Sequence, residues 1–508
     1  MPCGTIERSM VTPCLLATWV LLASGQAAAR PLDPALAEKS RVARERMAAG
    51  RYAEAAAAYR ELVQAVPGNA GLLVNLGMAL HLSGQDQEAI PPFEAALRLE
   101  PGSLPANLFL GAAQLRLGRG EAAVAPLQKA VRLQPDSLEA RSMLAEALMG
   151  LRRTAQAEPH LRRITQLAPA DPAAWFNLGQ AYEDLAAQHF HALLDKDPES
   201  PLTLALVGEV RLEEGRHRAA FQLYRQAAER APNLRGVHAA LARIYKETGH
   251  ADWAAVEEQK ERRLGPPDCA RDALACAFAA GKHREVVATG TASKAPDAPY
   301  WLARAYGALA TEAFGRLVAL PPSVHSYEWT ARQNRDQGRY AESAGLWRQA
   351  IGLSPREARL HTELAITLRQ QRDLAGAQRA LEEALKLDPA APDASYFLGD
   401  VLLAQDQPAR AIPFLEASLR ADPQAPHTHG ALGRAYALTG RPADAIPHLK
   451  QSLESDVDGS LRLQLGRAYQ ATGQAELARA ALADYEEFRK AAQPEAPEDA
   501  GAAITAPR

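Results

Sequence analysis

Three histidines, His427, His429 and His448, lie within the short segment HTHGALGRAYALTGRPADAIPHLK at residues 427–450. Histidine is a common ligand of zinc and other transition metals. A metal site needs converging ligands, such as two histidines four residues apart on a helix, or carboxylate support. His427 and His429 are two residues apart and point in different directions on a helix, and His448 lies on a second helix, well along from His429. We therefore expect no metal site.

Other motifs of catalytic chemistry are absent from the sequence. It contains no H-E-x-x-H, G-x-S-x-G or C-x-x-C-H pattern. The tripeptide GKH at residues 281–283 lacks the upstream glycine and the following Ser or Thr of a phosphate-binding P-loop. Adjacent acids such as Glu213 and Glu214 are typical of a solvated helix face. The sequence thus predicts a protein without enzyme activity, cofactor or metal.

Composition and charge indicate a foldable chain that does not bind nucleic acid. Apolar residues make up 47% and charged residues 23% of the 508 residues, which excludes a disordered chain. Aromatic residues are only 6% while alanine is abundant, a composition that favours closely packed helices. The net charge of -3 lacks the basic bias of a nucleic-acid-binding protein.

The first 29 residues have the pattern of a secretory signal peptide. Arg8 supplies a short positive region, VTPCLLATWVLLA is an apolar core, and Ala27–Ala29 offers a small-residue cleavage site. The alternative is an uncleaved anchor, but Met10–Ala29 is only just long enough to span a membrane and contains Pro13. We expect cleavage near Ala29 and a periplasmic or extracellular protein with no membrane span in the mature chain.

Cleavage would leave two cysteines, Cys269 and Cys276, in an oxidising compartment. Seven residues apart on one helix, they would lie about 10 Å from each other, too far for a disulfide. Pro266 and Pro267 favour a helix that starts later and leaves Cys269 free to reach its partner. The spacing therefore leaves the disulfide open.

A repeat of 34 residues dominates the chain. Prolines recur at this interval in three series, at positions 67, 101, 135 and 169, then at 198, 232 and 266, and then at 321, 355, 389 and 423. Within one interval, Leu76 and Leu80 share a face of a first helix, and Ala89 and Phe93 share a face of a second. Gly84 can take the left-handed conformation that ends the first helix. One such hairpin cannot bury its apolar faces alone, so the hairpins must stack.

This pattern resembles the tetratricopeptide repeat, a helix–turn–helix of 34 residues. The resemblance covers roughly residues 36–490, with repeats that start near residues 36, 70, 104, 138, 201, 324, 358, 392, 426 and 459. His238, His361 and His429 each occupy the fourth position of a repeat, usually a packing or edge position. The resemblance implies an all-α solenoid, a superhelix of stacked helix–turn–helix units.

Two repeats are shortened and lack the glycine turn, at residues 174–198 and 300–322. Their apolar residues correspond at an offset of 124, as Tyr182 and Tyr306 do, so the array looks internally duplicated. Without a turn, residues 173–195 could form one helix of about 34 Å. Two interpretations remain: a seam where sub-arrays pack, which we favour, or a bend that builds a partner pocket.

These features predict five regions in chain order. They are a signal peptide at residues 1–29, an N-terminal array at 30–264, a degenerate hairpin and linker at 265–299, a C-terminal array at 300–490 and a disordered tail at 491–508. The linker ends in ATGTASKAPDAP, which is rich in loop-forming residues, and the tail is rich in proline and alanine.

In tetratricopeptide arrays the first helices line a concave groove that binds peptides or protein segments. The resemblance places fifteen residues in that groove: the apolar Val74, Met78, Leu82, Leu108, Leu115 and Met149, the acidic Glu183, Asp184, Glu209 and Glu213, and the basic Arg332, Arg335, Arg369, Arg434 and Arg467. We expect extended segments to bind along this groove, with charge setting their orientation. The alternative is that the charged residues are merely solvated.

We therefore predict a non-catalytic scaffold that binds protein or peptide partners, in the assembly of an envelope or secretion complex. Two alternatives remain. The chain could be an accessory or substrate-binding subunit of an envelope enzyme system, or a cytoplasmic adaptor if the signal is not cleaved. The sequence does not indicate the partner or the oligomeric state.

Overall fold

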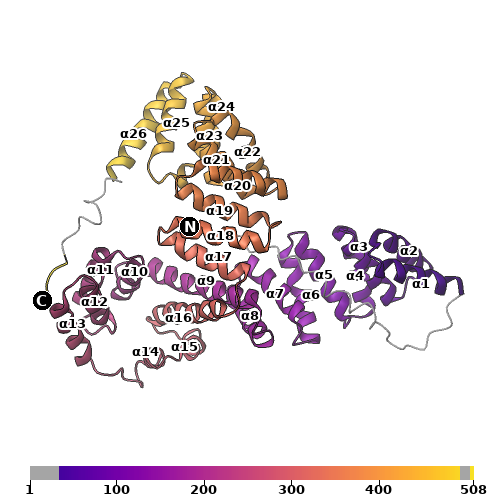
Figure 1. The fold of residues 1–508 in the computed structure, drawn as a ribbon, viewed down its shortest axis with the longest axis horizontal. Coiled ribbons are helices and arrows are strands. Elements are labelled where there is room, and N and C mark those ends of the chain that lie inside the picture. The colour runs from indigo at the N-terminus through magenta and orange to yellow at the C-terminus, as the bar shows by residue number, and fades with distance from the viewer. Residues whose placement is uncertain (1–33, 492–503, 508) are drawn as a thin grey trace. The chain divides into compact units, whose positions relative to one another are not determined.

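The computed structural model describes residues 34–491 and 504–507, so the predicted signal peptide at residues 1–29 lies outside the described residues. Within them the chain forms 26 α-helices, one short 3₁₀ helix and no strand. The predicted all-α solenoid of helix–turn–helix units is confirmed (Figure 1). None of the described helices combines the length and apolar character needed to cross a membrane.

The described residues divide into two compact units. The first unit runs to Gln188 and includes Ala303–Ala313, and the second contains the remainder. The first unit holds the paired helices α1 (Pro34–Ala48), α2 (Tyr52–Ala65), α3 (Ala70–Leu82), α4 (Asp86–Leu99), α5 (Leu104–Arg116), α6 (Gly120–Leu133), α7 (Leu138–Gly150) and α8 (Thr154–Leu167), and most of α9 (Pro172–Lys196).

The second unit holds a longer series of hairpins. They are α10 (Pro201–Glu213), α11 (His217–Arg230), α12 (Val237–Glu247), α13 (Ala251–Arg263), α14 (Ala273–Ala279), α15 (His283–Gly290), α17 (Val324–Asp336), α18 (Tyr340–Leu353), α19 (Ala358–Gln370), α20 (Leu374–Leu387), α21 (Pro392–Ala404), α22 (Pro408–Ala421), α23 (Pro426–Leu438), α24 (Pro442–Gln451), α25 (Ser460–Ala471) and α26 (Ala475–Ala491). Helix α16 (Ala298–Ala319) contributes to both units.

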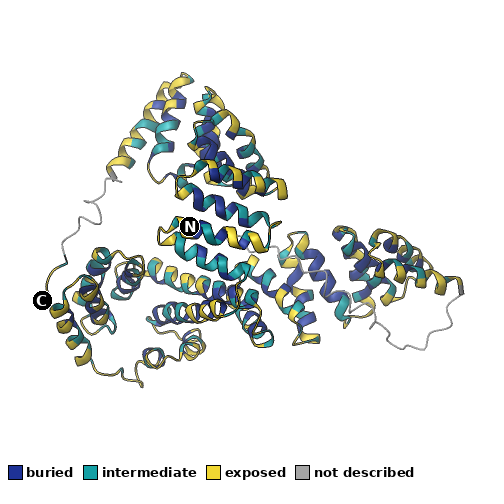
Figure 2. Cartoon of the chain, viewed as in Figure 1, coloured by how far each residue is buried: buried dark blue, intermediate teal, exposed yellow. Residues whose placement is uncertain are grey.

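Each hairpin buries the faces that its periodicity predicts. Ala89 and Phe93 of α4 are 0% exposed, and Leu76 and Leu80 of α3 are also buried. Figure 2 shows the same pattern along the arrays, with buried residues on the helix sides that meet their neighbours and exposed residues on the outer sides. The stacked hairpins therefore share continuous apolar cores, as expected for a repeat that cannot fold alone.

The turn within each hairpin needs a left-handed residue. Gly84 and Gly440 supply it with φ angles of 83° and 73°. At the same repeat position Arg152, Arg372 and Asp406 adopt φ angles of 58°, 65° and 58°. A side chain in this region costs about 1–2 kcal/mol relative to glycine. The stacking of the hairpins thus maintains the left-handed turn even where the residue is not glycine and the conformation is unfavourable.

A second feature that recurs among the hairpins is the close approach of the two helices at one small residue. A Cβ atom added to Gly399 of α21 would lie 2.5 Å from Cγ of Leu415 in α22, and Leu415 is fully buried. A Cβ added to Gly345 of α18 would meet no atom within 4 Å. Glycine is therefore required for packing at the first position and only tolerated at the second.

Replacing Gly399 with alanine is expected to lower the free energy of unfolding by about 1–3 kcal/mol, because the added methyl group overpacks the hairpin. The control Gly345→Ala should instead raise it by about 0.5–1 kcal/mol, because alanine restricts the unfolded chain and favours the helix. Urea unfolding followed by circular dichroism measures both. Equal shifts for the two variants would contradict this account of the close approach.

The two predicted turn-less repeats are continuous helices. Helix α9 has 25 residues and α16 has 22, so the prediction of a single helix in each shortened repeat is confirmed. Tyr182 of α9 and Tyr306 of α16, which correspond at the offset of 124, pack with ring centroids 6.0 Å apart. Both are buried. The corresponding tyrosines of the two long helices thus pack against each other, which supports the seam interpretation.

The partly buried carboxylate of Glu158 borders this seam. The Tyr182 hydroxyl donates to Oε1 of Glu158 over 3.1 Å. Burial and then the nearby Glu158 charge raise the pKa of Tyr306 to about 12. The other aromatic residues of the shortened repeats are also mainly packed: Phe176, Tyr300, Trp301 and Phe314 are buried, while Trp175 and Phe190 are partly buried.

Candidate functional site

The inner side of the arrays is set by the first helices of the hairpins. Consecutive first helices contact one another directly, and consecutive second helices do so less. The first-helix contacts are those of α3 with α5, α5 with α7, α10 with α12, α19 with α21, α21 with α23, and α23 with α25. A stack whose members are closer on one side bends toward that side. The first helices therefore line the concave side within each stretch, where the predicted groove residues lie.

In the first unit, the predicted apolar groove residues are divided between core and surface. Val74, Met78 and Leu108 are at most 8% exposed and belong to the packing between helices. Leu82, Leu115 and Met149 are partly exposed at the first-helix ends. Only this second set offers apolar surface to a ligand.

The predicted acidic groove residues also differ in how exposed their side chains are and in whether they are hydrogen-bonded. Glu183 of α9 is exposed, whereas Asp184 beside it accepts hydrogen bonds from Thr154 and from Nε2 of Gln188, the latter over 2.9 Å. In the second unit, Glu209 of α10 is partly exposed and Glu213 is exposed. Burial by neighbouring side chains and then the Glu209 charge raise the pKa of Glu213.

Three of the predicted basic groove residues are ion-paired with carboxylates on the first helices. Arg335 of α17 pairs with Glu363 of α19 over 2.6 Å, and Arg369 of α19 pairs with Asp400 of α21 over 2.6 Å. Arg332 pairs with the buried Glu328 one helical turn before it. The first two pairs tie consecutive first helices together, and all three form a ladder of charges along the lining. The lining of α17–α21 is therefore close to charge-balanced.

The remaining two basic residues differ from the ladder. Arg434 of α23 is partly exposed and Arg467 of α25 is exposed. Within the part of the chain that the structure describes, neither forms an ion pair, in contrast to Arg369, which lies two repeats before Arg434. The net positive lining of the second unit is therefore concentrated on α23 and α25.

Sequence reasoning missed the carboxylates of this ladder. Glu363 and Asp400 follow Arg335 and Arg369 by 28 and 31 residues, close to one repeat. A comparison of charges one repeat apart on the same helix face could have found them. Counting charges within each repeat could not.

The histidines of the opening segment lie where two helices of one hairpin meet. His427 is exposed and His429 is buried, so they do point in different directions. The expectation that His448 lies far from His429 is wrong: their Nδ1 atoms are 2.8 Å apart and their rings stack with centroids 5.0 Å apart. No group of three or more His, Cys, Asp or Glu side chains among the described residues is arranged to hold a metal ion.

Hydrogen bonding gives this pair a definite structural role. His429 Nε2 lies 3.0 Å from the carbonyl oxygen of Pro423, which can only accept, so Nε2 donates. The neutral ring then presents Nδ1 as an acceptor to the Nδ1–H of His448. Burial is the main cause that lowers the pKa of His448, and protonation of His429 would lower it further.

The same two repeat positions carry His238 and Glu257 in the hairpin α12–α13. Nδ1 of His238 lies 2.5 Å from Oε2 of Glu257. Glu257 is 3% exposed, and its other oxygen, Oε1, accepts from Nζ of Lys260 over 2.8 Å. The hydrogen bond to Glu257 is the main cause that raises the pKa of His238. The same pair of repeat positions thus holds His238, which favours its charged form, in one repeat and His448, which favours its neutral form, in another.

These two pairs are expected to respond to pH in opposite directions. The raised pKa of His238 contributes stability that is present below the ordinary histidine pKa and is lost as pH rises through the folded-state value. The lowered pKa of His448 contributes stability that is present above the ordinary value and is lost as pH falls through it. Removing His238 should therefore cost more at pH 5.5 than at pH 8, and removing His448 more at pH 8 than at pH 5.5.

Urea unfolding of His238→Gln and His448→Gln at both pH values measures this difference, with the wild-type chain as reference at each pH. The variants serve as controls for each other, because they change the same residue type in equivalent hairpins. A pH dependence of the same sign in both would contradict the assignment.

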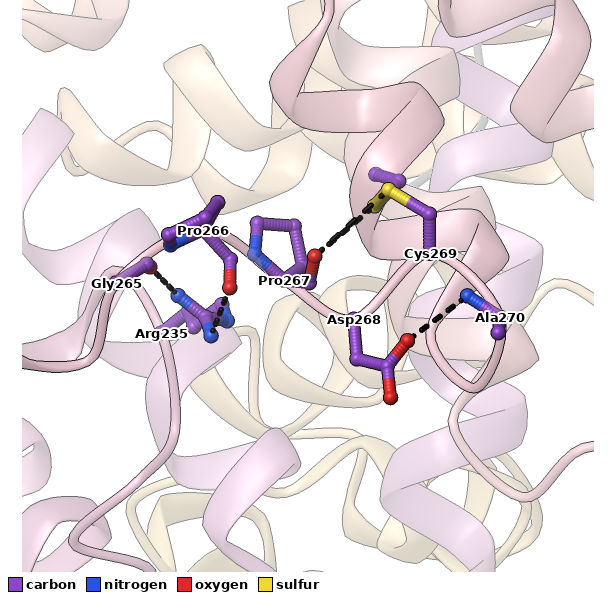
Figure 3. The surroundings of a disulfide bond; sticks show 8 residues. Arg235, Gly265, Pro266, Pro267, Asp268, Cys269 and Ala270 are labelled. Atoms are coloured by element: carbon purple, nitrogen blue, oxygen red, sulfur yellow. Dashed lines mark hydrogen bonds between the residues drawn. A yellow bond between two sulfur atoms is a disulfide. The ribbon is translucent and has the colours of Figure 1, made fainter.

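Cys269 and Cys276, whose pairing the spacing left open, are joined by a disulfide with Cα atoms 5.5 Å apart. Helix α14 begins at Ala273, so Cys269 precedes the helix and is free to reach Cys276. Both sulfur atoms lie near the Pro267 carbonyl oxygen, at 3.7 and 3.5 Å (Figure 3). Arg235 binds the carbonyl groups of Leu264, Gly265 and Pro266 and so caps the end of α13 next to this loop.

Comparisons with known proteins agree with this geometry. Two family models, each described as tetratricopeptide repeat, match the chain, one at residues 42–103, 184–234, 330–377 and 362–426, and the other at 83–146, 121–182 and 402–461. No curated protein sequence matches it.

Solved structures with similar folds are smaller than this chain. A MamA chain from Desulfovibrio magneticus RS-1 has 21% identity and a TM-score of 0.31, over 34% of this chain and 97% of that one. YrrB, described as a TPR protein with an unusual peptide-binding site, has 18% identity and a TM-score of 0.31, over 36% of this chain and 94% of that one. These likenesses carry no functional argument. The family matches, together with the stacked hairpins and their turns, show that the chain belongs to the tetratricopeptide repeat family.

Proposed function

We propose that this scaffold for protein–protein interaction is non-catalytic and binds an extended, acidic segment of a partner protein along helices α23 and α25. The observation that carries the proposal is the contrast between Arg434 and Arg467, which form no ion pair with described residues, and the paired arginines of α17–α19. The charge of Arg434 helps to lower the pKa of Asp458, but neither arginine is neutralised by a direct ion pair. Such charges on the concave side can attract and orient an oppositely charged segment.

We further propose that the protein acts outside the cytoplasm, in the assembly of an envelope or secretion complex. Residues 1–29 have the pattern of a signal peptide, and a disulfide such as Cys269–Cys276 persists mainly in oxidising compartments. N-terminal sequencing of the protein from the envelope fraction tests this. A start near Arg30 supports it, and an intact Met1 in the cytoplasmic fraction overturns it.

Crosslinking and affinity purification of the tagged protein from its envelope fraction tests the binding proposal. We expect a stoichiometric partner that is retained by the wild-type chain and lost by at least about tenfold in Arg434→Glu/Arg467→Glu, because the reversed charges repel an acidic segment. Raising the salt concentration should weaken the wild-type complex in the same direction.

The matched control is Arg420→Glu/Lys450→Glu. Both residues are exposed on second helices, α22 and α24, and the double reversal changes net charge by the same amount. We expect this control to keep the partner. Equal retention by the two double variants would overturn the assignment of the binding surface to α23 and α25. The ladder arginines are unsuitable for this test, because reversing them would also break contacts between helices.

A further inference from the structure

A tyrosine near the end of the first helix occurs in several repeats, and its hydroxyl group needs a hydrogen-bond acceptor. Tyr436 of α23 donates to Oε1 of Glu416, which lies 20 residues earlier on α22, over 2.6 Å. Tyr245 of α12 occupies the equivalent position, and the residue 20 places before it on α11 is Arg225. The usual acceptor position is thus filled by a second donor.

Tyr245 and Arg225 are held in place by aromatic neighbours. Tyr245 is only 2% exposed, and its ring packs edge-on against Phe221 and Trp253 with centroids 5.6 Å apart in both cases. The guanidinium group of Arg225 lies 5.7 Å from the ring centroid of Phe221, and its side chain is 22% exposed. The guanidinium group of Arg225 has no acceptor for the proton of the Tyr245 hydroxyl, and a buried hydroxyl without an acceptor is costly, at about 1–3 kcal/mol.

The chain itself supplies the acceptors from a distant segment. The Tyr245 hydroxyl donates to the backbone carbonyl oxygen of Thr505 over 2.6 Å. Nη1 of Arg225 donates to Oγ1 of the same threonine, also over 2.6 Å. Ile504 and Pro507, on either side, are partly buried, whereas Thr505 and Ala506 are exposed apart from these bonds.

We propose that Tyr245 and Arg225 form a second peptide-binding site, separate from the positions that line the groove, and that its ligand is the chain's own segment Ile504–Pro507. The Tyr245 hydroxyl binds the backbone carbonyl oxygen of Thr505, and Arg225 binds the hydroxyl group of the same residue. The site therefore selects an extended segment with threonine or serine at its centre, flanked by apolar residues. Because the ligand belongs to the same chain, its effective concentration is high and the free site is rare.

Fluorescence polarisation with a labelled peptide GAAITAPR, the sequence of residues 501–508, tests the site on the full-length chain. The wild-type chain should bind the peptide weakly, because its own segment competes. The variant Thr505→Ala should bind it at least about tenfold more tightly, because the internal segment has lost the hydroxyl that Arg225 holds. A peptide with valine in place of threonine should bind this variant about tenfold more weakly.

Two further variants test the donors in the Thr505→Ala background. Adding Tyr245→Phe or Arg225→Glu should each reduce peptide affinity by at least about tenfold. Adding Tyr436→Phe, at the equivalent tyrosine that Glu416 already satisfies, should leave affinity unchanged. Thermal unfolding of every variant shows whether the fold is kept, and the valine peptide tests recognition without any change to the protein.

The proposal is overturned if the peptide binds wild type and Thr505→Ala equally, or if loss of the Tyr245 hydroxyl leaves its affinity unchanged. Failure of this site is distinct from failure of the groove. The double variant Arg434→Glu/Arg467→Glu changes residues on α23 and α25 only, so we expect the peptide affinity of the Thr505→Ala chain to survive it.

Discussion

Replacing Trp347 with alanine is expected to lower the free energy of unfolding by about 3–5 kcal/mol, the usual range for a large aromatic removed from a core. Trp347 lies on α18, is 0% exposed and belongs to the core cluster that extends from α17 to α26. It is the largest fully buried side chain among the described residues. The surrounding helices are joined to further repeats on one side and cannot collapse freely into the space left by the indole ring.

The loss should be local as well as large. In a repeat protein each hairpin contacts mainly its neighbours, so stability is distributed along the array. Amide hydrogen exchange should accelerate most in α17–α20, while α3–α6 in the first unit keep their protection. Val457→Ala is the control, because Val457 is 91% exposed and its loss should change stability by less than about 0.5 kcal/mol. Uniform loss of protection across both units would contradict a repeat-by-repeat distribution of stability.

The repeat boundaries were predictable from the sequence because the signals that set them are local. Repeats predicted to start near residues 70, 104, 138 and 201 correspond to helices that begin at Ala70, Leu104, Leu138 and Pro201. Left-handed turns such as Gly84 and prolines after the second helix recur once per repeat and mark both ends of the hairpin. Even the missing turns could be interpreted, since α9 and α16 are continuous.

The chemistry of the site was less predictable, because it depends on which residues meet across repeats. The groove positions were assigned one repeat at a time, and this hid the pairing of Arg335 with Glu363 in the next first helix. The contact between His429 and His448 was missed for a related reason. Residues 19 apart meet only because two antiparallel helices bring their positions together, as they also do for His238 and Glu257.

The contact of Thr505 with Tyr245 lies beyond any repeat-based argument. The two residues are 260 positions apart, and residues 491–508 have the composition of a disordered tail. What the sequence does contain is the substitution of Arg225 at the position where Glu416 serves another repeat. Such a departure from the pattern of equivalent repeats is a signal for function that an isolated repeat does not show.

Replacing Glu328 with alanine is expected to lower the free energy of unfolding by about 3 kcal/mol, because it breaks a buried ion-pair cluster. Glu328 of α17 is 1% exposed on its side chain and accepts two hydrogen bonds of 2.8 Å from Arg359 of α19, one on each oxygen. It also pairs with Arg332 on its own helix. Bidentate pairing of this kind is both strong and specific in geometry.

The expected loss lies at the lower end of the range for buried pairs, because the two arginines can still reach water. Their side chains are 28% and 22% exposed, so each guanidinium group can rotate toward solvent once the carboxylate is gone. The conservative variant Glu328→Gln should lose most of the same stability, since it keeps the shape but not the charge that neutralises the two cations. Urea unfolding at low and high salt measures both variants.

The matched control is Glu363→Ala, which removes a carboxylate from the same ladder where the pair with Arg335 is 19% and 16% exposed. We expect a loss of about 1 kcal/mol there, with a stronger dependence on salt, because solvent and ions screen the more exposed pair. If the two alanine variants lost equal stability, burial would not decide the strength of the ladder. Its pairs would then act only as surface charges, and the register of consecutive first helices would rest on apolar packing alone.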